Sequence, residues 1–118
     1  MSNKVVWFEV VGQDADKMRS FYGSLFGWNF NVMPELDYGL TACDETGLAG
    51  GVGKAMGPGG WSTFYVSVDD LDATIANAKA AGASVLAPPW VLPDGDRACV
   101  LADPEGHPVG LVAPGTPS

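Results

Sequence analysis

The stretch VVWFEVVGQDADKMRSFYGSLFGW, residues 5–28, predicts the first strand and the first helix of the fold. Its opening residues, 5–11, are mostly valines and aromatics, which favour a β-strand. Asp14 can accept a backbone N–H as the N-cap of the following helix, and Gly27 can end that helix in the left-handed conformation. The spacing i, i+3, i+4, i+7 predicts a buried helical face formed by Met18, Phe21, Tyr22 and Leu25.

Downstream of this stretch the chain completes a first module. Three further strands are predicted at 28–33, 37–43 and 47–53, because turn-forming residues separate these segments. A Gly/Pro-rich connector, KAMGPGG at residues 54–60, follows them. The first module therefore has the order βαβββ.

The same order occurs a second time. A strand at 61–68 leads into a helix that Asp69 or Asp70 can cap and Gly82 can end. The inner face of this second helix is predicted to hold Leu71, Ile75 and Ala78. The remaining strands are predicted at 83–87, 97–102 and 108–113.

The two halves are related by a nearly constant offset. Matching Asp70 to Asp14 gives 56 residues, and matching Gly82 to Gly27 gives 55. We therefore expect two βαβββ modules, at about 4–53 and 61–113, within a single domain spanning residues 1–118. Two such units can share a curved sheet, with the helices outside and a concave face inside.

Composition excludes several classes of function. Fourteen acidic residues against six basic ones give a net charge of -8, which disfavours binding to nucleic acid and to anionic membrane surfaces. No apolar run is long enough to span a membrane. The first residues lead directly into a strand pattern, so we expect no signal peptide and a cytoplasmic location.

Cysteine and histidine are scarce. Cys43 and Cys99 each lie in a strand-like segment and form no CxxC pair, so we predict that both pack as small buried hydrophobes. His107 is the only histidine, which excludes a metal site built from several histidines of one chain.

Several motifs resemble one superfamily. The opening stretch, with FY at 21–22 and FGW at 26–28, resembles vicinal oxygen chelate proteins of the glyoxalase/bleomycin-resistance/extradiol-dioxygenase superfamily. Residues 66–90 and 101–111 resemble the second half and closing turn of the same proteins. The resemblance covers about residues 4–113 and implies an α+β fold. In that fold two βαβββ modules form a curved mixed sheet with a concave cup, often completed as a homodimer.

The resemblance also assigns the usual metal-ligand positions of the superfamily to Trp7, Thr63 and Gly110. None of these side chains is a good ligand for a divalent ion. We therefore expect no bound metal and no other cofactor, and the resemblance by itself does not imply glyoxalase activity.

Glu9 is the charged residue in the first strand. Strand side chains alternate between faces, so Trp7, Glu9 and Val11 are expected on the concave face. The expected ligand-binding residues are Trp7, Glu9, Trp61, Thr63, Tyr65, Trp90, Arg97 and Gly110. Trp61 and Trp90 would line the mouth, with Trp90 in a loop, and Arg97 would lie beside the cup.

Two interpretations of Glu9 remain open. In the first, its carboxylate is a hydrogen-bond acceptor, a counter-charge or a general base for a bound ligand, which makes Glu9 the single candidate catalytic residue. In the second, a backbone N–H, Tyr65 or an arginine satisfies the carboxylate, which then only holds the structure together.

The favoured function is a metal-independent small-molecule binding protein of the bleomycin-resistance type, with an aromatic or amphipathic ligand in a tryptophan-lined cup. The alternatives are a glyoxalase-type lyase or isomerase, and an accessory domain without a ligand of its own. A homodimer is expected, because a second copy would cover the open sheet edges.

Overall fold

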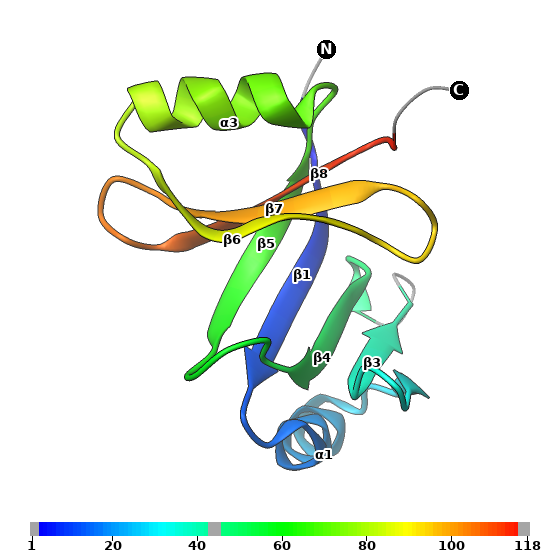
Figure 1. Cartoon of the computed structure of the whole chain (residues 1–118). Helices are drawn as coiled ribbons and strands as arrows, with labels where there is room; N and C mark the ends of the chain where they lie inside the picture. Colours follow the sequence, from blue (N-terminus) through cyan, green and yellow to red (C-terminus); the bar gives the residue numbers. More distant parts are fainter. Residues whose placement is uncertain (1–2, 43–45, 116–118) are drawn as a thin grey trace. The chain divides into compact units, whose positions relative to one another are not determined.

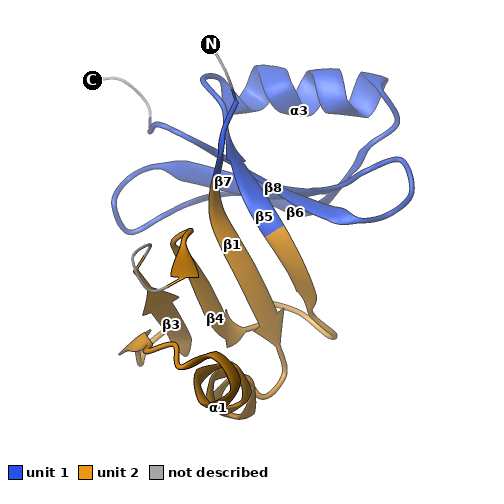
Figure 2. Cartoon of the chain, turned by 180° about the vertical axis from the view of Figure 1, so that it is seen from behind, with its two compact units in different colours: residues 1–5, 64–118 blue, residues 6–63 orange. Residues whose placement is uncertain are grey.

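The computed structural model describes residues 3–42 and 46–115. The chain divides into two compact units, coloured separately in Figure 2. Unit 2 contains residues 6–63, and unit 1 contains residues 64–118 together with 1–5. The boundaries fall within the strands β1 (Val5–Gly12) and β5 (Trp61–Ser67). The assignment of the whole chain to a single domain stays a prediction.

Unit 2 contains the helix α1 (Ala15–Phe26) and four neighbouring strands in the order β2-β3-β4-β1 (Figure 1). The added strands are β2 (Asn31–Met33), β3 (Tyr38–Thr41) and β4 (Gly50–Lys54). β1 pairs with β4 in parallel, whereas β3 pairs with β2 and with β4 in the antiparallel sense. A parallel pair needs a long crossover connection, and residues 13–49 supply it with α1.

Unit 1 repeats this arrangement. β5 pairs in parallel with β8 (Pro108–Ala113), and β7 (Arg97–Ala102) pairs in the antiparallel sense with β8 and with β6 (Ser84–Val91). The helix α3 (Leu71–Ala80) packs its Leu71 and Ile75 into a core cluster with Cys99 and Leu111. The α+β class and the two successive βαβββ modules are therefore confirmed.

The predicted helix caps are confirmed except at the end of α3, where Ala81 is the C-cap and Gly82, with φ 105°, follows it. Asp14 accepts a hydrogen bond from the backbone N–H of Lys17 at 3.1 Å, and Gly27 follows α1 with φ 73°. Asp70, rather than Asp69, caps α3 by accepting from the N–H of Ala73 at 3.0 Å. Each of the two aspartates satisfies a backbone donor that the first helical turn leaves without a partner.

The predicted buried face of α1 was wrong in part. Phe21 and Leu25 are 57% and 59% exposed, whereas the buried residues of the helix are Ala15 and Arg19. Compared with the predicted orientation, α1 is rotated so that Arg19 faces β3. A Cβ on Gly39 of that strand would come within 2.6 Å of the Arg19 Cδ. Spacing of apolar residues alone could not reveal a buried arginine. These two apolar side chains are exposed in the single chain. The expected homodimer stays a prediction.

The structure corrects the position of Trp90 as well. Trp90 is in β6, paired with Ala98, and not in a loop. β6 passes through Pro88 and Pro89 because it is the edge strand of its unit, and its pairing with β7 is irregular between Ala87 and Trp90. An edge strand tolerates prolines, which cannot donate a backbone hydrogen bond.

Cys99 is fully buried in the core of unit 1, as predicted, and burial raises the pKa of its thiol. Cys43 lies outside the described residues. Within the described part of the chain, neither helix has the length and hydropathy needed to cross a membrane.

Candidate functional site

Glu9 is the centre of a hydrogen-bond network in unit 2. The hydroxyl of Tyr38 donates to Glu9 Oε1 at 3.0 Å, and the indole N–H of Trp61 donates to Glu9 Oε2 at 3.1 Å. The indole N–H of Trp7 in turn donates to the Tyr38 hydroxyl at 3.1 Å. We call Trp7, Glu9, Tyr38 and Trp61 the Glu9 network. All four side chains are half-buried, so the network is held in place yet remains accessible.

Two glycines of β4 create the space for Tyr38. Gly51 and Gly53 are two residues apart, so they share one face of the strand. A Cβ on Gly51 would come within 2.1 Å of the Tyr38 ring, and a Cβ on Gly53 within 2.5 Å. The ring therefore lies directly against β4, and its hydroxyl reaches Glu9, which pairs with Gly51 in the β1–β4 register.

The Glu9 network lies on the face of unit 2 opposite α1. Gly39 and Tyr38 are adjacent in β3, so their side-chain positions point to opposite faces. Arg19 of α1 lies against Gly39, which places Tyr38 on the other face. This confirms that Trp7 and Glu9 share one face of β1, and it adds Tyr38 as a partner that the sequence analysis did not identify.

The environment of Tyr38 keeps its phenol protonated. Burial is the main cause that raises its pKa above the ordinary value of 10.0, and the negative charge of Glu9 raises it further. A neutral phenol is a hydrogen-bond donor, which is the role Tyr38 has toward the Glu9 carboxylate. The network therefore pairs a charged acceptor with neutral donors.

This raised pKa predicts a loss of stability in alkali. The unfolded chain releases the Tyr38 proton near pH 10, and the folded chain holds it to higher pH, so the stabilisation is complete below about pH 10 and declines above it. We expect the free energy of unfolding to fall less steeply above pH 10 in Tyr38→Phe than in the parent chain. Urea unfolding from pH 8 to 11 measures this, with Tyr22→Phe as the matched loss of a phenol from unit 2. Parallel pH profiles for the parent and Tyr38→Phe would contradict the prediction.

The connector between the modules positions Trp61. The side-chain amide of Gln13 donates to the carbonyls of Gly57 and Gly59 at 2.9 and 2.7 Å. A Cβ on Gly60 would come within 2.1 Å of the Val11 carbonyl oxygen, so the chain just before Trp61 lies against the β1 backbone. These contacts hold Trp61 where its indole N–H can donate to Glu9.

Arg19 holds the opposite face of unit 2 together. Its guanidinium donates to the carbonyls of Asp37 and Val52 at 3.2 and 3.1 Å. It also donates to the carboxylates of Asp16 and Asp37 at 2.8 and 2.7 Å. The three bonds to Asp37 and Val52 join α1 to β4 and to the turn before β3, and they help to place the β3–β4 pair on which Tyr38 lies.

Two interpretations of Glu9 were open. The hydrogen bonds from Tyr38 and Trp61 are of the kind expected for the second, in which the carboxylate holds the structure together. Thr63 is buried in the same unit. Tyr65 is the phenol that the sequence offers as a possible partner of Glu9. Tyr65 belongs to unit 1, where its buried ring lies against Gly110, at a position where a Cβ would come within 2.4 Å of the ring.

The remaining expected site residues lie in unit 1. Trp90 is half-buried in β6. Arg97 had been expected beside the cup as a partner for Glu9 or for an anionic ligand. Its guanidinium nitrogens lie 3.4 Å from the carboxylate oxygens of Asp72 on α3, so its charge is directed toward the helix.

The customary metal-ligand positions do not fit a divalent ion. The Trp7 nitrogen is a protonated indole that donates to Tyr38, so it has no lone pair for a metal. Thr63 supplies a neutral hydroxyl, and Gly110 has no side chain. Within residues 3–42 and 46–115, no three His, Cys, Asp or Glu side chains are grouped as a metal site would require.

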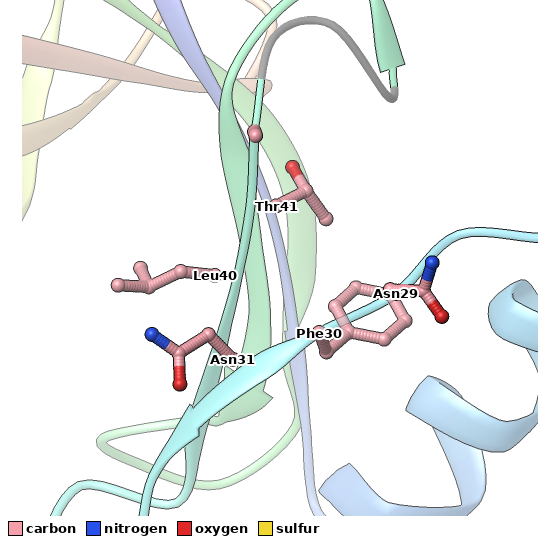
Figure 3. A pocket seen from close by; sticks show the side chains of 6 residues that line it. Asn29, Phe30, Asn31, Leu40 and Thr41 are labelled. Atoms are coloured by element: carbon pink, nitrogen blue, oxygen red, sulfur yellow. The ribbon is translucent and has the colours of Figure 1, made fainter.

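A separate open pocket of about 490 Å³ lies at the β2–β3 side of unit 2 and is lined by Asn29, Phe30, Asn31, Leu40, Thr41 and Ala42. Figure 3 shows Asn31 and Leu40 on one side of these strands and Phe30 and Thr41 on the other. The lining residues carry no ionisable group. The candidate site is therefore placed at the Glu9 network, where charge and hydrogen-bond donors converge.

Tyr38 is the site residue that the sequence analysis missed. It is separated from Glu9 by 29 positions in the chain. The pair of glycines at 51 and 53 was a usable signal, because glycines on one face of a strand often mark the close approach of another group.

Comparison with known proteins agrees with this architecture. The chain is 31% identical over 114 residues to proteins of Mycobacterium bovis and Mycobacterium tuberculosis named "Putative glyoxylase CFP32". The match covers 89% of this chain and 43% of those relatives, so the chain spans less than half of their length.

Solved structures share the fold. A glyoxalase/bleomycin resistance protein/dioxygenase superfamily member from Vibrio splendidus has a TM-score of 0.63 at 15% identity, with 95% of this chain and 98% of that chain covered. Methylmalonyl-CoA epimerase from Mycobacterium tuberculosis has a TM-score of 0.62 at 16% identity, with 95% and 88% covered.

The family match spans almost the whole chain, because residues 4–111 fit the sequence pattern of one superfamily. The two βαβββ modules of the chain and its FY and FGW motifs agree with that match. The chain belongs to the Glyoxalase/Bleomycin resistance protein/Dioxygenase superfamily.

Proposed function

We propose that this chain is a metal-independent small-molecule binding protein of the bleomycin-resistance type, which holds an aromatic or amphipathic ligand against the Glu9 network. The observation that carries the proposal is that the Trp61 indole and the Tyr38 phenol both donate to the Glu9 carboxylate, while the Trp7 indole donates to that phenol. Ligand sites combine large apolar surfaces with a few fixed polar groups, and this network has that composition.

The geometry supports a preorganised site. Trp7, Tyr38 and Trp61 each use a polar atom within the network, so their rings are held in one orientation before a ligand arrives. Rings that are already fixed lose little rotational freedom on binding, which favours affinity. The half-buried state of all four side chains leaves surface for a ligand to cover.

A glyoxalase-type lyase or isomerase is the first alternative. The name of the mycobacterial relatives suggests it. The site itself argues against the metal-dependent form of that chemistry, since Trp7, Thr63 and Gly110 occupy the customary ligand positions. The second alternative is an accessory domain, in which the bonds from Tyr38 and Trp61 to Glu9 would be purely structural.

Heteronuclear NMR of the indole N–H groups tests the proposal. On titration with a panel of planar drugs and metabolites, we expect the resonances of Trp7 and Trp61 to shift for at least one compound. The Trp28 resonance is the internal control, because its ring packs with two rings of α1, 5.0 Å from Phe26 and 6.1 Å from Tyr22 between centroids.

Truncation of the network gives the second arm of this experiment. Trp7→Ala should abolish the shift at Trp61 for a ligand that the parent chain binds. A panel that leaves both Trp7 and Trp61 unmoved would favour the accessory domain over the binding protein. A stoichiometric divalent ion in the purified protein, measured by elemental analysis, would instead favour the lyase or isomerase.

A further inference from the structure

We propose that the ligand held against the Glu9 network is elongated and extends across unit 2 to Asn31, where it ends in an uncharged hydrogen-bonding group such as a carboxamide. This inference rests on the proposed function and adds the length of the ligand and the chemistry of its far end. Three features of unit 2 support it: the strand register, the surface between the two ends, and the open pocket at the β2–β3 side.

The strand register sets Glu9 and Asn31 in one row across the sheet. Glu9 pairs with Gly51 of β4, which pairs in turn with Leu40 of β3. Leu40 pairs with Asn31 of β2. Residues directly opposite each other on neighbouring strands share one face of the sheet, so the whole row lies on the face of the Glu9 network. Three steps of the usual strand separation make the row about 14 Å long.

The surface between the two ends is apolar. The Tyr38 ring lies against Gly51 and Gly53, so it covers β4 in the middle of the row. Leu40 is two residues after Tyr38 in β3, so both side chains point to the face of the Glu9 network. Both residues are half-buried, which leaves part of each for a ligand to cover. An apolar chain that starts at the indoles can therefore continue over Tyr38 and Leu40.

The open pocket of about 490 Å³ marks the far end of the row. Leu40 and Asn31 are among its lining residues, and Figure 3 shows their side chains on the same side of the two strands. The exposed Asn31 carboxamide can both donate and accept a hydrogen bond. The six residues that line the pocket carry no ionisable group, so they offer no counter-charge to a charged group. This end of the row therefore suits an uncharged group that can exchange hydrogen bonds with Asn31.

Four indole probes test the inference. The compound 6-(indol-3-yl)hexanamide carries its carboxamide on a long tether, whereas indole-3-acetamide carries the same group on a short one. The long tether ends in a charged group in 6-(indol-3-yl)hexanoate and in a methyl group in 3-hexylindole. In the parent chain we expect both amides to shift the Trp7 and Trp61 indole resonances. Only the long amide should also shift the side-chain NH₂ resonances of Asn31.

Two variants locate the contact. Asn31→Ala should weaken binding of the hexanamide about fivefold, the scale of one net hydrogen bond, and leave binding of 3-hexylindole unchanged. Asn77→Ala removes an exposed carboxamide from α3 of unit 1 and should change neither affinity. The hexanoate should bind at least about fivefold more weakly than the hexanamide, because its charged end finds no partner in the pocket. The Asn31 resonances of the parent chain report the contact even if Asn31→Ala fails to fold.

The outcomes separate the two proposals. Unmoved Asn31 resonances would overturn this inference, and so would equal losses of hexanamide affinity in Asn31→Ala and Asn77→Ala. Binding of the hexanoate as tightly as the hexanamide would overturn it too, and so would a failure of all four probes to bind. The proposed function stands in each case as long as some compound of the wider panel shifts the Trp7 and Trp61 resonances. If the four probes and the wider panel all leave these two resonances unmoved, both proposals fail.

Discussion

Replacing Arg19 by leucine is expected to lower the free energy of unfolding by about 3 kcal/mol. The Arg19 side chain is 8% exposed, and its guanidinium makes four hydrogen bonds, two of them to the carbonyls of Asp37 and Val52. Leucine would fill part of the space but leave the buried Val52 carbonyl without this donor. An unsatisfied buried polar group costs more than the net value of the hydrogen bond that it loses.

Two variants separate the buried contacts from the surface ion pair. Asp16→Asn removes the charge of a partner that is 92% exposed, and we expect a change below about 0.5 kcal/mol. Arg19→Lys keeps the charge but not the planar fork that reaches several acceptors, so its cost should lie between the two. Urea unfolding gives all three values. A loss below about 1 kcal/mol for Arg19→Leu would mean that the hydrogen bonds of Arg19 contribute little to the free energy of unfolding.

Replacing Gly51 by alanine is the second large effect. The added Cβ would lie 2.1 Å from the Tyr38 ring, well inside van der Waals contact, so the ring must move. Because Tyr38 connects Trp7 to Glu9, its displacement should break both of its hydrogen bonds. We expect a loss of about 2 kcal/mol of stability from overpacking, together with a shift of the Trp7 indole resonance.

Gly57→Ala is the matched control for this substitution. Gly57 lies in the connector with no atom within 4 Å of an added Cβ, so the change should be nearly neutral. The double variant Gly51→Ala with Tyr38→Ala should be less destabilised than the sum of the single changes, because the second change removes the colliding ring. Strict additivity would place the clash somewhere other than Tyr38.

Elements with local signals were predictable from the sequence. The caps at Asp14 and Asp70 act within three residues of their own position, so their residue types suffice to place the helix starts. The repeated βαβββ order follows in the same way from strand, cap and turn residues read twice. The alternation of β1 also placed Trp7 and Glu9 on one face, because the period of a strand is two residues.

The face of α1 was less predictable. The spacing of its apolar residues predicted a buried face that includes Phe21 and Leu25, and nothing in that spacing pointed to Arg19. Arg19 became the buried residue because carbonyls of Asp37 and Val52, far away in the chain, satisfy its guanidinium. Helical periodicity contains no information about such distant acceptors.

The residues themselves determine the strands, the helix starts, the modular repeat, and the presence of Glu9 beside an indole on one strand face. The tertiary structure alone selects the partners of that carboxylate. Tyr38 and Trp61 are 29 and 52 positions away from Glu9. They reach it only because the strand register sets Gly51 beside Glu9 and the connector contacts bring Trp61 forward. Local preferences act over a few residues, whereas hydrogen bonds between strands and loops join atoms whose separation in the chain is unrestricted.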